Sequence, residues 1–294
     1  MAEAAAIAMT AESVPMSPGR RALRRLLKRK GAVIGLGVIV LMIALALFAP
    51  LIAPYDPIAT DWGAVRKGPS SAHWLGTDEN GRDMLSRVIW GARASLLAGV
   101  ISVSIALGIG VPVGLTAGYI GGWTDSIISR FTDAMLAIPF LILAIALAAF
   151  LGPSLGNVMI AIGISATPIF IRLTRGQVIA TKVEDYVEAA RALGNPHLRI
   201  ALRHLFPNIV PPLLVQATLA IAAAIIAEAS LAFLGLGQQP PAPSWGVMLF
   251  VSQRFFENAP WMAIWPGVAI FVTVLAFNLF GDGLRDALDP KQAR

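Results

Sequence analysis

Six apolar segments run through this 294-residue chain, and they constrain its fold more than any other feature. A helix needs about 20 mostly apolar residues to cross about 30 Å of hydrocarbon. Charged residues make up only 14% of the chain and the mean hydropathy is +0.72, whereas soluble domains carry about 25% charged residues. The sequence therefore predicts an all-α membrane protein with six transmembrane helices, over Ala32–Ala53, Arg93–Thr116, Phe131–Leu151, Val158–Leu173, Ile209–Leu234 and Trp261–Phe280.

Basic residues beside these segments predict how the chain crosses the membrane. Lys and Arg concentrate in the cytoplasmic loops of membrane proteins. Seven of them precede the first span: Arg20, Arg21, Arg24, Arg25, Lys28, Arg29 and Lys30. Six crossings return the C-terminus to the same side, so we expect both termini in the cytoplasm. The first apolar run is longer than the roughly 7–15 residues of a cleaved signal peptide, which favours a retained span.

The long connection predicted to lie outside, residues 54–92, carries a cluster of charges. Its acidic residues alternate with arginines, and we expect them to be solvated: Asp78, Glu79 and Asp83 with Arg82 and Arg87. Asp78 or Asn80 is placed to cap a short helix over Arg82–Trp90, because such side chains accept hydrogen bonds from the first turn of a helix. The predicted role of this segment is therefore structural.

Two features inside the spans have both a static and a functional interpretation. Gly110, Gly114, Gly118 and Gly122 recur every four residues, which favours close packing of a neighbouring helix. Glu228 stands two turns from the end of the fifth span and is a candidate gate or pathway residue, since a charge in the bilayer is costly unless it faces protein or water. The alternative for Glu228, and for Asp133 in the third span, is a buried hydrogen bond.

Several kinds of chemistry lack a signal in the sequence. The chain has no cysteine and three histidines, and it contains no GxxxxGK[ST] phosphate loop, HExxH or GxSxG motif. We therefore expect no catalytic residue, metal site or cofactor in this chain. The net charge of +6 arises from residues beside the spans, so it indicates membrane orientation and no nucleic-acid partner. Uphill transport by such a chain would need energy from another subunit.

One polar stretch, YVEAARALGNPHLRIALRHLFPN at residues 186–208, interrupts the apolar chain. Val183, Tyr186, Val187, Ala190 and Leu193 follow helical spacing and predict one packed face. Leu198, Ala201, Leu202 and Leu205 repeat this spacing after Gly194-Asn195-Pro196, and Gly followed by Pro ends a helix. The stretch is therefore predicted to be two short helices joined by a sharp turn on the cytoplasmic surface.

This stretch resembles the "EAA" signature of ABC importer permeases. The resemblance is carried by Glu188-Ala189-Ala190, by Gly194 and by His204-Leu205-Phe206-Pro207. The signature commonly has Ile in place of His204 and Leu in place of Phe206. Three further segments are similar to the peptide/nickel branch of these permeases: LGTDENGRDMLSRVIWGARASLLAG at 75–99, ASLAFLGLGQQPPAPSWGVML at 229–249 and FNLFGDGLRDALDPK at 277–291.

The resemblance implies a type I ABC importer permease fold in the bacterial inner membrane. It implies the second of two permease subunits, beside a homologous permease, two ATPase subunits that bind ATP and Mg, a periplasmic or lipid-anchored substrate-binding protein, and membrane lipid. The implied cargo is a dipeptide or oligopeptide, with glutathione or nickel as alternatives. An ion-gradient-driven secondary transporter is the alternative from another class.

The resemblance also assigns parts of the chain. It implies a basic N-terminal tail at 1–30, a first span with external loop at 31–92, a permease core at 93–283 and a C-terminal tail at 284–294. Within the core, a coupling helix at 183–205 would dock on the ATPase. The residues expected at that contact are Asp185, Tyr186, Glu188, Ala189, Ala190, Arg191 and Gly194.

Overall fold

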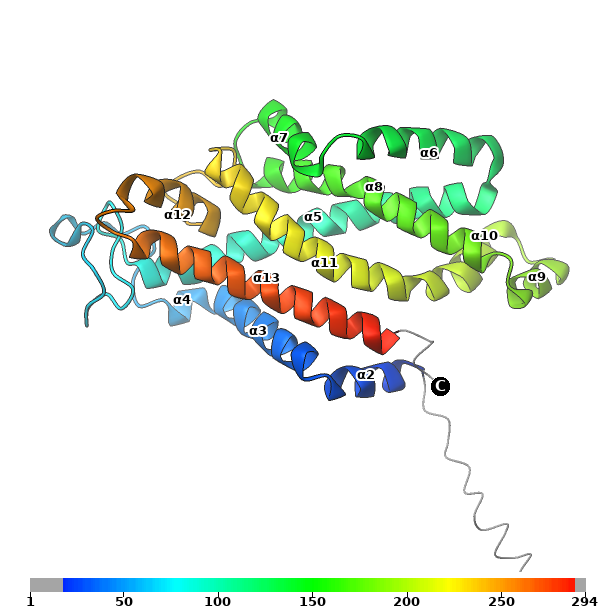
Figure 1. The fold of residues 1–294 in the computed structure, drawn as a ribbon, viewed down its shortest axis with the longest axis horizontal. Helices are drawn as coiled ribbons and strands as arrows, with labels where there is room; N and C mark the ends of the chain where they lie inside the picture. The colour runs from blue at the N-terminus through cyan, green and yellow to red at the C-terminus, as the bar shows by residue number, and fades with distance from the viewer. Residues whose placement is uncertain (1–17, 289–294) are drawn as a thin grey trace, which may run out of the picture.

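The computed structural model describes residues 18–288, and this part of the chain consists of helices and connecting loops (Figure 1). Five helices are long and apolar enough to cross a membrane, and a bent helix pair makes a sixth possible span. This confirms the predicted all-α membrane fold. The long helices are α3 (Lys30–Leu47), α5 (Met84–Ile120), α8 (Leu155–Thr181), α11 (Phe206–Phe233) and α13 (Trp261–Leu288).

The third predicted span is not one straight helix. The chain forms α6 (Gly122–Leu136) and α7 (Phe140–Leu151), which meet at 89°. Pro139 lies at the break, where its backbone is extended. Proline has no N–H to donate and disfavours helical geometry in the residue before it. The apolar composition of residues 131–151 thus gave no indication of the break between the two helices.

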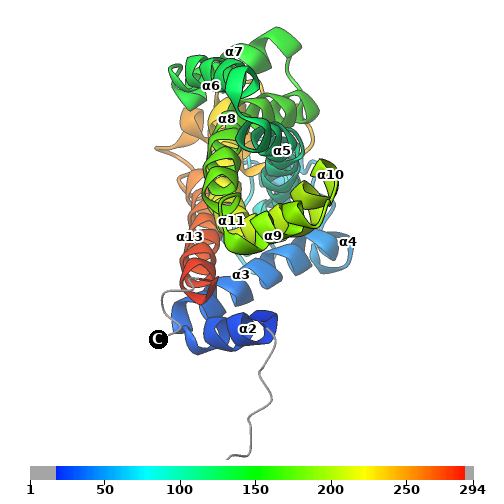
Figure 2. The ribbon, with the colours of Figure 1, turned by 90° about the vertical axis from the view of Figure 1, so that its right-hand side faces the viewer.

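Short helices mark the two ends of the bundle (Figure 1). What we call the α9 end holds α2 (Pro18–Lys28), α9 (Asp185–Ala192), α10 (His197–Arg199) and the π-helical turn η2 (Ile200–Leu205). Figure 2 looks onto this end. The opposite, α12 end holds α4 (Ala49–Ile52), η1 (Trp62–Ala64), α12 (Trp245–Ser252) and η3 (Gln253–Phe255).

Helices α5 and α8 pack at close range along much of their length. A Cβ atom added to Gly114 would lie 2.5 Å from the backbone oxygen of Ile171, and one added to Gly110 would lie 2.7 Å from the Cβ of Phe170. Gly118 meets Val178 in the same way, at 2.8 Å. The predicted glycine ladder therefore does serve helix packing, except at Gly122, where nothing lies within 4 Å.

A second close pair joins the first and last long helices. A Cβ on Gly35 of α3 would lie 2.6 Å from the backbone oxygen of Ala276 on α13, and one on Gly283 would clash with the Cβ of Ala32. Arg29, at the start of α3, also forms an ion pair with Asp286 at 3.2 Å. Helix α11 packs between the two pairs and contacts α5, α8 and α13.

Candidate functional site

Helix α9 ends in a turn that its sequence explains. The N–H of Gly194 donates to the carbonyl of Arg191 at 3.0 Å, and the N–H of Asn195 donates to the carbonyl of Ala190 at 3.3 Å. This pair of bonds is the Schellman motif, which needs a left-handed residue after the helix. Gly194 supplies it with φ of +74°. The predicted helix–turn–helix is therefore present between α9 and α10.

The exposed face of α9 is wider than its spacing predicts. Val187 and Ala190 are buried, as expected, but Val183, Tyr186 and Leu193 are exposed, Leu193 to 83%. Of the residues expected at an ATPase contact, all but Ala190 are exposed: Asp185, Tyr186, Glu188, Ala189, Arg191 and Gly194. Three of the five apolar side chains that were expected to pack on this chain are therefore exposed instead.

Two hydrogen bonds tie the α9 turn to the end of α5. The Nζ of Lys182, before α9, donates to the carbonyl of Gly118 at 2.9 Å. The hydroxyl of Tyr119 lies 2.8 Å from the Nδ1 of His197, which begins α10. The segment therefore contacts α5 both before and after its turn.

A groove lies beside these contacts, between the end of α5 and the α10–η2 segment. Its volume is about 570 Å³. Four polar or charged side chains line it, from Thr116, Tyr119, Arg191 and His197. The remaining lining is apolar, with Leu198 and Leu202 both largely exposed. The second predicted helix thus buries Ala201 and Leu205 but leaves its two other leucines on the surface.

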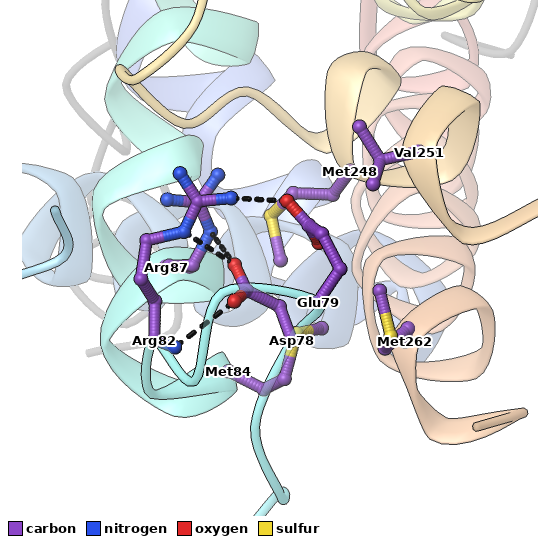
Figure 3. A pocket seen from close by; sticks show the side chains of 8 residues that line it. All are labelled: Asp78, Glu79, Arg82, Met84, Arg87, Met248, Val251 and Met262. Atoms are coloured by element: carbon purple, nitrogen blue, oxygen red, sulfur yellow. Dashed lines mark hydrogen bonds and ion pairs between the residues drawn. The ribbon is translucent and has the colours of Figure 1, made fainter. Parts of the chain in front are cut away.

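The charge cluster at the α12 end is buried, which corrects the prediction of a solvated loop. Asp78, Arg82, Asp83 and Arg87 are each at most 6% exposed. The Nε of Arg82 donates to Asp78 at 2.6 Å, and the Nε of Arg87 lies 3.2 Å from the same carboxylate. Figure 3 shows Asp78, Arg82 and Arg87 converging beside the methionines of α5, α12 and α13. Their mutual pairing makes the burial of charge tolerable.

Long-range contacts complete this cluster. The Nη1 of Arg87 donates to the backbone oxygens of Pro57 at 2.8 Å and of Pro241 at 3.3 Å, so it joins both long loops of the α12 end. Arg82 also pairs with Glu79 at 2.5 Å. Burial raises the pKa of the Glu79 carboxyl, and the adjacent Asp78 raises it further. The alternating charges of 78–87 were the sequence signal for this network.

The cap of α5 also differs from the prediction. Neither Asp78 nor Asn80 caps a helix at 82–90. Instead α5 begins at Met84, and the Asp83 side chain accepts a hydrogen bond from the N–H of Ser86 at 2.8 Å. The second carboxylate oxygen of Asp83 lies 3.0 Å from the Nδ1 of His73. The predicted short helix is therefore the first part of the second span.

Glu228 lies inside the bundle. It is fully buried on α11, where its Oε2 accepts a hydrogen bond from the Ser95 hydroxyl of α5 at 3.1 Å. Its Oε1 has no hydrogen-bond partner among the described residues. Helix α12 packs on α11 close by, since a Cβ on Gly246 would lie 2.7 Å from the Cα of Ala229. Asp133, in contrast, is exposed and pairs with Arg172 at 2.6 Å.

Comparison with known proteins identifies the chain. Residues 110–294 match the family described as "Binding-protein-dependent transport system inner membrane component". The chain belongs to this family. Residues 17–69 also match the "N-terminal TM domain of oligopeptide transport permease C". These matches confirm the resemblance to ABC importer permeases of the dipeptide/oligopeptide branch. They also confirm the expected location, as a multi-pass protein of the bacterial inner membrane.

Similar permeases match almost the whole chain. The dipeptide transport system permease protein DppC of Alkalihalophilus pseudofirmus is 49% identical over 276 residues, which cover 94% of this chain and 91% of that protein. The glutathione transport system permease protein GsiD of Pectobacterium atrosepticum is 46% identical, over 94% of this chain and 92% of that protein. The probable D,D-dipeptide transport system permease protein DdpC of Escherichia coli is 47% identical, over 86% and 85%.

The fold is likewise that of a solved importer. A chain of the inward-facing MetNI methionine ABC transporter superposes with a TM-score of 0.57, covering 70% of this permease and 98% of that chain. Its identity to this permease is 20%, so this likeness concerns the fold alone. It confirms the predicted type I permease architecture. Among residues 18–288, no group of three His, Cys, Asp or Glu side chains is arranged to hold a metal ion.

Proposed function

We propose that this permease is one of two permease subunits in an ATP-driven importer of dipeptides or oligopeptides. A homologous second permease, two ATPase subunits and a periplasmic or lipid-anchored binding protein complete the assembly. This chain catalyses no reaction, and ATP with Mg binds in the ATPase subunits. Family membership and the dipeptide permeases among its relatives support this assignment.

The α9 end faces the cytoplasm in this proposal, with both termini on that side. The basic residues of α2 and of the α8–α10 connection support this orientation, because Lys and Arg favour the cytoplasmic side. The α12 end, with its buried charge cluster, then faces the binding protein. The network formed by Arg87 keeps that surface in one arrangement, because it joins two loops to α5.

The observation that carries the coupling role is the exposed, tethered α9 turn. Tyr186 and Leu193 project from it, while Lys182 and His197 bond to the end of α5. A pull on α9 by a closing pair of ATPase subunits is thus applied to α5 directly. Because α5 packs on α8 at close range, the two helices move together, which suits a rigid-body switch between outward and inward states.

Glu228 is proposed to act at the gate that this motion operates. It joins α11 to α5 through Ser95, and α12 packs against the same part of α11. A buried carboxyl with one unpartnered oxygen is costly to keep, so a conformation that gives this oxygen a partner gains stability from it. The gate role would place that partner in the alternative transport state.

Two experiments test the assignment. The permease is co-expressed with its neighbouring subunits and purified through its own tag, and stable co-purification of an ATPase supports the importer. Its absence, together with ion-gradient-driven uptake in vesicles, would establish the secondary transporter instead. The reconstituted complex is then assayed for ATPase stimulation by the cognate binding protein loaded with dipeptides, oligopeptides, glutathione or a nickel complex.

The second assay decides the cargo. Stimulation by di- or oligopeptides alone supports the proposal. Stimulation by glutathione alone would transfer the assignment to the alternative favoured by the GsiD relatives. Stimulation by the nickel complex alone would exclude peptide import by this system.

A further inference from the structure

Helix α2 carries its cations and leucines on separate arcs. With about 100° of rotation per residue, Arg20, Arg24 and Lys28 follow one another along one side of PGRRALRRLLK. Leu23 and Leu27 lie directly beside that row. Leu26 falls on the far side of the two leucines. Such a helix, with basic residues on one arc and leucines on another, suits the plane of a membrane surface.

Contacts in the structure fix which arc faces the protein. Leu26 is buried against Ala32 of α3 and Ala287 of α13. Leu23 and Leu27 remain 55% and 56% exposed. These two leucines line one open hollow together with the cations Arg20, Arg24 and Lys28. The helix therefore packs Leu26 against the protein and exposes Leu23, Leu27 and the three cations side by side.

The position of α2 places this face at the boundary of the lipid. Helix α2 ends at Lys28, and α3 begins at Lys30 after a break with extended backbone at Arg29. The exposed apolar side chains of α3 begin at once, with Val33 at 42% and Ile34 at 61% exposed. At about 1.5 Å per residue, these lie only about 5 Å along the axis from the start of α3. Helix α2 therefore lies at headgroup level.

We propose that the exposed face of α2 binds anionic phospholipid. Arg20, Arg24 and Lys28 contact the phosphates, while Leu23 and Leu27 enter the acyl-chain region beneath them. The ion pair between Arg29 and Asp286 and the packing of Leu26 hold this face in place on α3 and α13. Because α3 and α13 are themselves closely packed, the lipid binds to a preformed surface. This binding is a property of the chain alone and does not depend on the cargo or the ATPase.

The test uses the full-length chain in detergent and two short-chain lipids, phosphatidylglycerol and phosphatidylcholine. Binding of each is measured by native mass spectrometry. The variant R20Q/R24Q/K28Q removes three exposed cations from α2. Its matched control, R66Q/K67Q/R254Q, removes three exposed cations from the α12 end. Each surface cation near an anionic membrane contributes about 1 kcal/mol, or roughly fivefold in affinity, so we expect the α2 variant to bind phosphatidylglycerol at least tenfold more weakly.

The R20Q/R24Q/K28Q variant should bind phosphatidylcholine as the wild type does. The control variant should bind both lipids as the wild type does. A second variant, L23S/L27S, should weaken binding of both lipids, because the leucines contact the acyl chains. Equal phosphatidylglycerol affinity in the wild type and the R20Q/R24Q/K28Q variant would overturn the proposal. So would complete displacement of the lipid by millimolar inorganic phosphate, which would show a free-anion site. Circular dichroism of each variant identifies any that fails to fold, and the leucine variant then provides an independent reading.

Discussion

The Ser95 hydroxyl of α5 donates a hydrogen bond to the Glu228 carboxyl of α11 at 3.1 Å, in the interior of the permease. The two residues are 133 positions apart in the chain, and both are fully buried. The bond therefore joins α5, which contacts the α9 turn, to α11, which follows that turn in the chain. Any movement of α5 relative to α11 must therefore keep, stretch or break this bond.

The gate role predicts that Glu228→Gln assembles normally but transports at least tenfold more slowly. The amide can still accept from Ser95 through its oxygen, but its NH2 group only donates hydrogen bonds, whereas the second carboxyl oxygen can accept one. Uptake into vesicles at equal protein content measures the effect. Ser95→Ala is the companion variant and should cost about 1–3 kcal/mol of stability, because it leaves the buried Glu228 carboxyl without the hydrogen bond to its Oε2. Wild-type uptake by Glu228→Gln would leave Glu228 with a structural role alone.

Gly194→Val is expected to uncouple transport while membrane insertion continues. The residue at 194 adopts φ of +74°, a conformation that costs a β-branched side chain about 1–2 kcal/mol. No atom lies within 4 Å of the added Cβ, so the effect is one of backbone strain. The measurement is the ratio of peptide uptake to ATP hydrolysis in the reconstituted complex. Gly194→Asn is the control and should stay near wild type, since Asn tolerates this conformation. An equal ratio of uptake to hydrolysis in Gly194→Val and Gly194→Asn would show that the backbone conformation of the turn has no part in coupling.

Gly114→Val should separate α5 from α8. The added Cβ would lie 2.5 Å from the backbone oxygen of Ile171, which cannot move without moving α8. Overpacking of this kind costs about 1–3 kcal/mol, so the thermal unfolding midpoint in detergent should fall. Gly108→Val on the same helix is the control, because nothing lies within 4 Å of that position. A midpoint lowered equally in both variants would point to helix propensity instead of packing.

Arg87→Met should destabilise the α12 end more than any exposed arginine does. Removing one partner of a buried ion pair costs about 3–5 kcal/mol, and here Asp78 and the carbonyls of Pro57 and Pro241 each lose a contact. Limited proteolysis of the loops around residues 57 and 241 reports the loss locally. Arg254→Met, at an exposed position, should leave the cleavage rate unchanged. Wild-type protection of both loops in Arg87→Met would contradict the network's role.

The raised pKa of Glu79 predicts a pH-dependent contribution to stability. Burial makes the folded-state pKa higher than that of the unfolded chain, so the folded state holds the proton more tightly. The stabilisation is complete below the unfolded pKa and is lost as pH rises through the folded pKa. The unfolding midpoint of the wild type should therefore rise, relative to Glu79→Gln, as the pH falls through this window. A wild-type midpoint that falls relative to that of Glu79→Gln on acidification would mean that pairing with Arg82 outweighs burial.

The sequence by itself determined the class of this protein and the position of the turn between α9 and α10. Apolar length alone predicts spans, because hydrocarbon thickness fixes how many residues a crossing needs. The turn at Gly194 was also readable, since its Schellman geometry depends only on residues within six positions. These features are local in the chain, and local chemistry is what a sequence displays directly.

Only the tertiary structure decided which charges and which leucines are exposed. Arg87 becomes buried because Pro241, 154 positions away, supplies a carbonyl for it, and a charge can leave water only when such partners are present. Leu193 becomes exposed because the fold places no other element of the described chain over its face of α9. The same helical spacing can therefore mark a packed face or an exposed face. What separates the two is contact between segments that are distant in sequence, which periodicity does not encode.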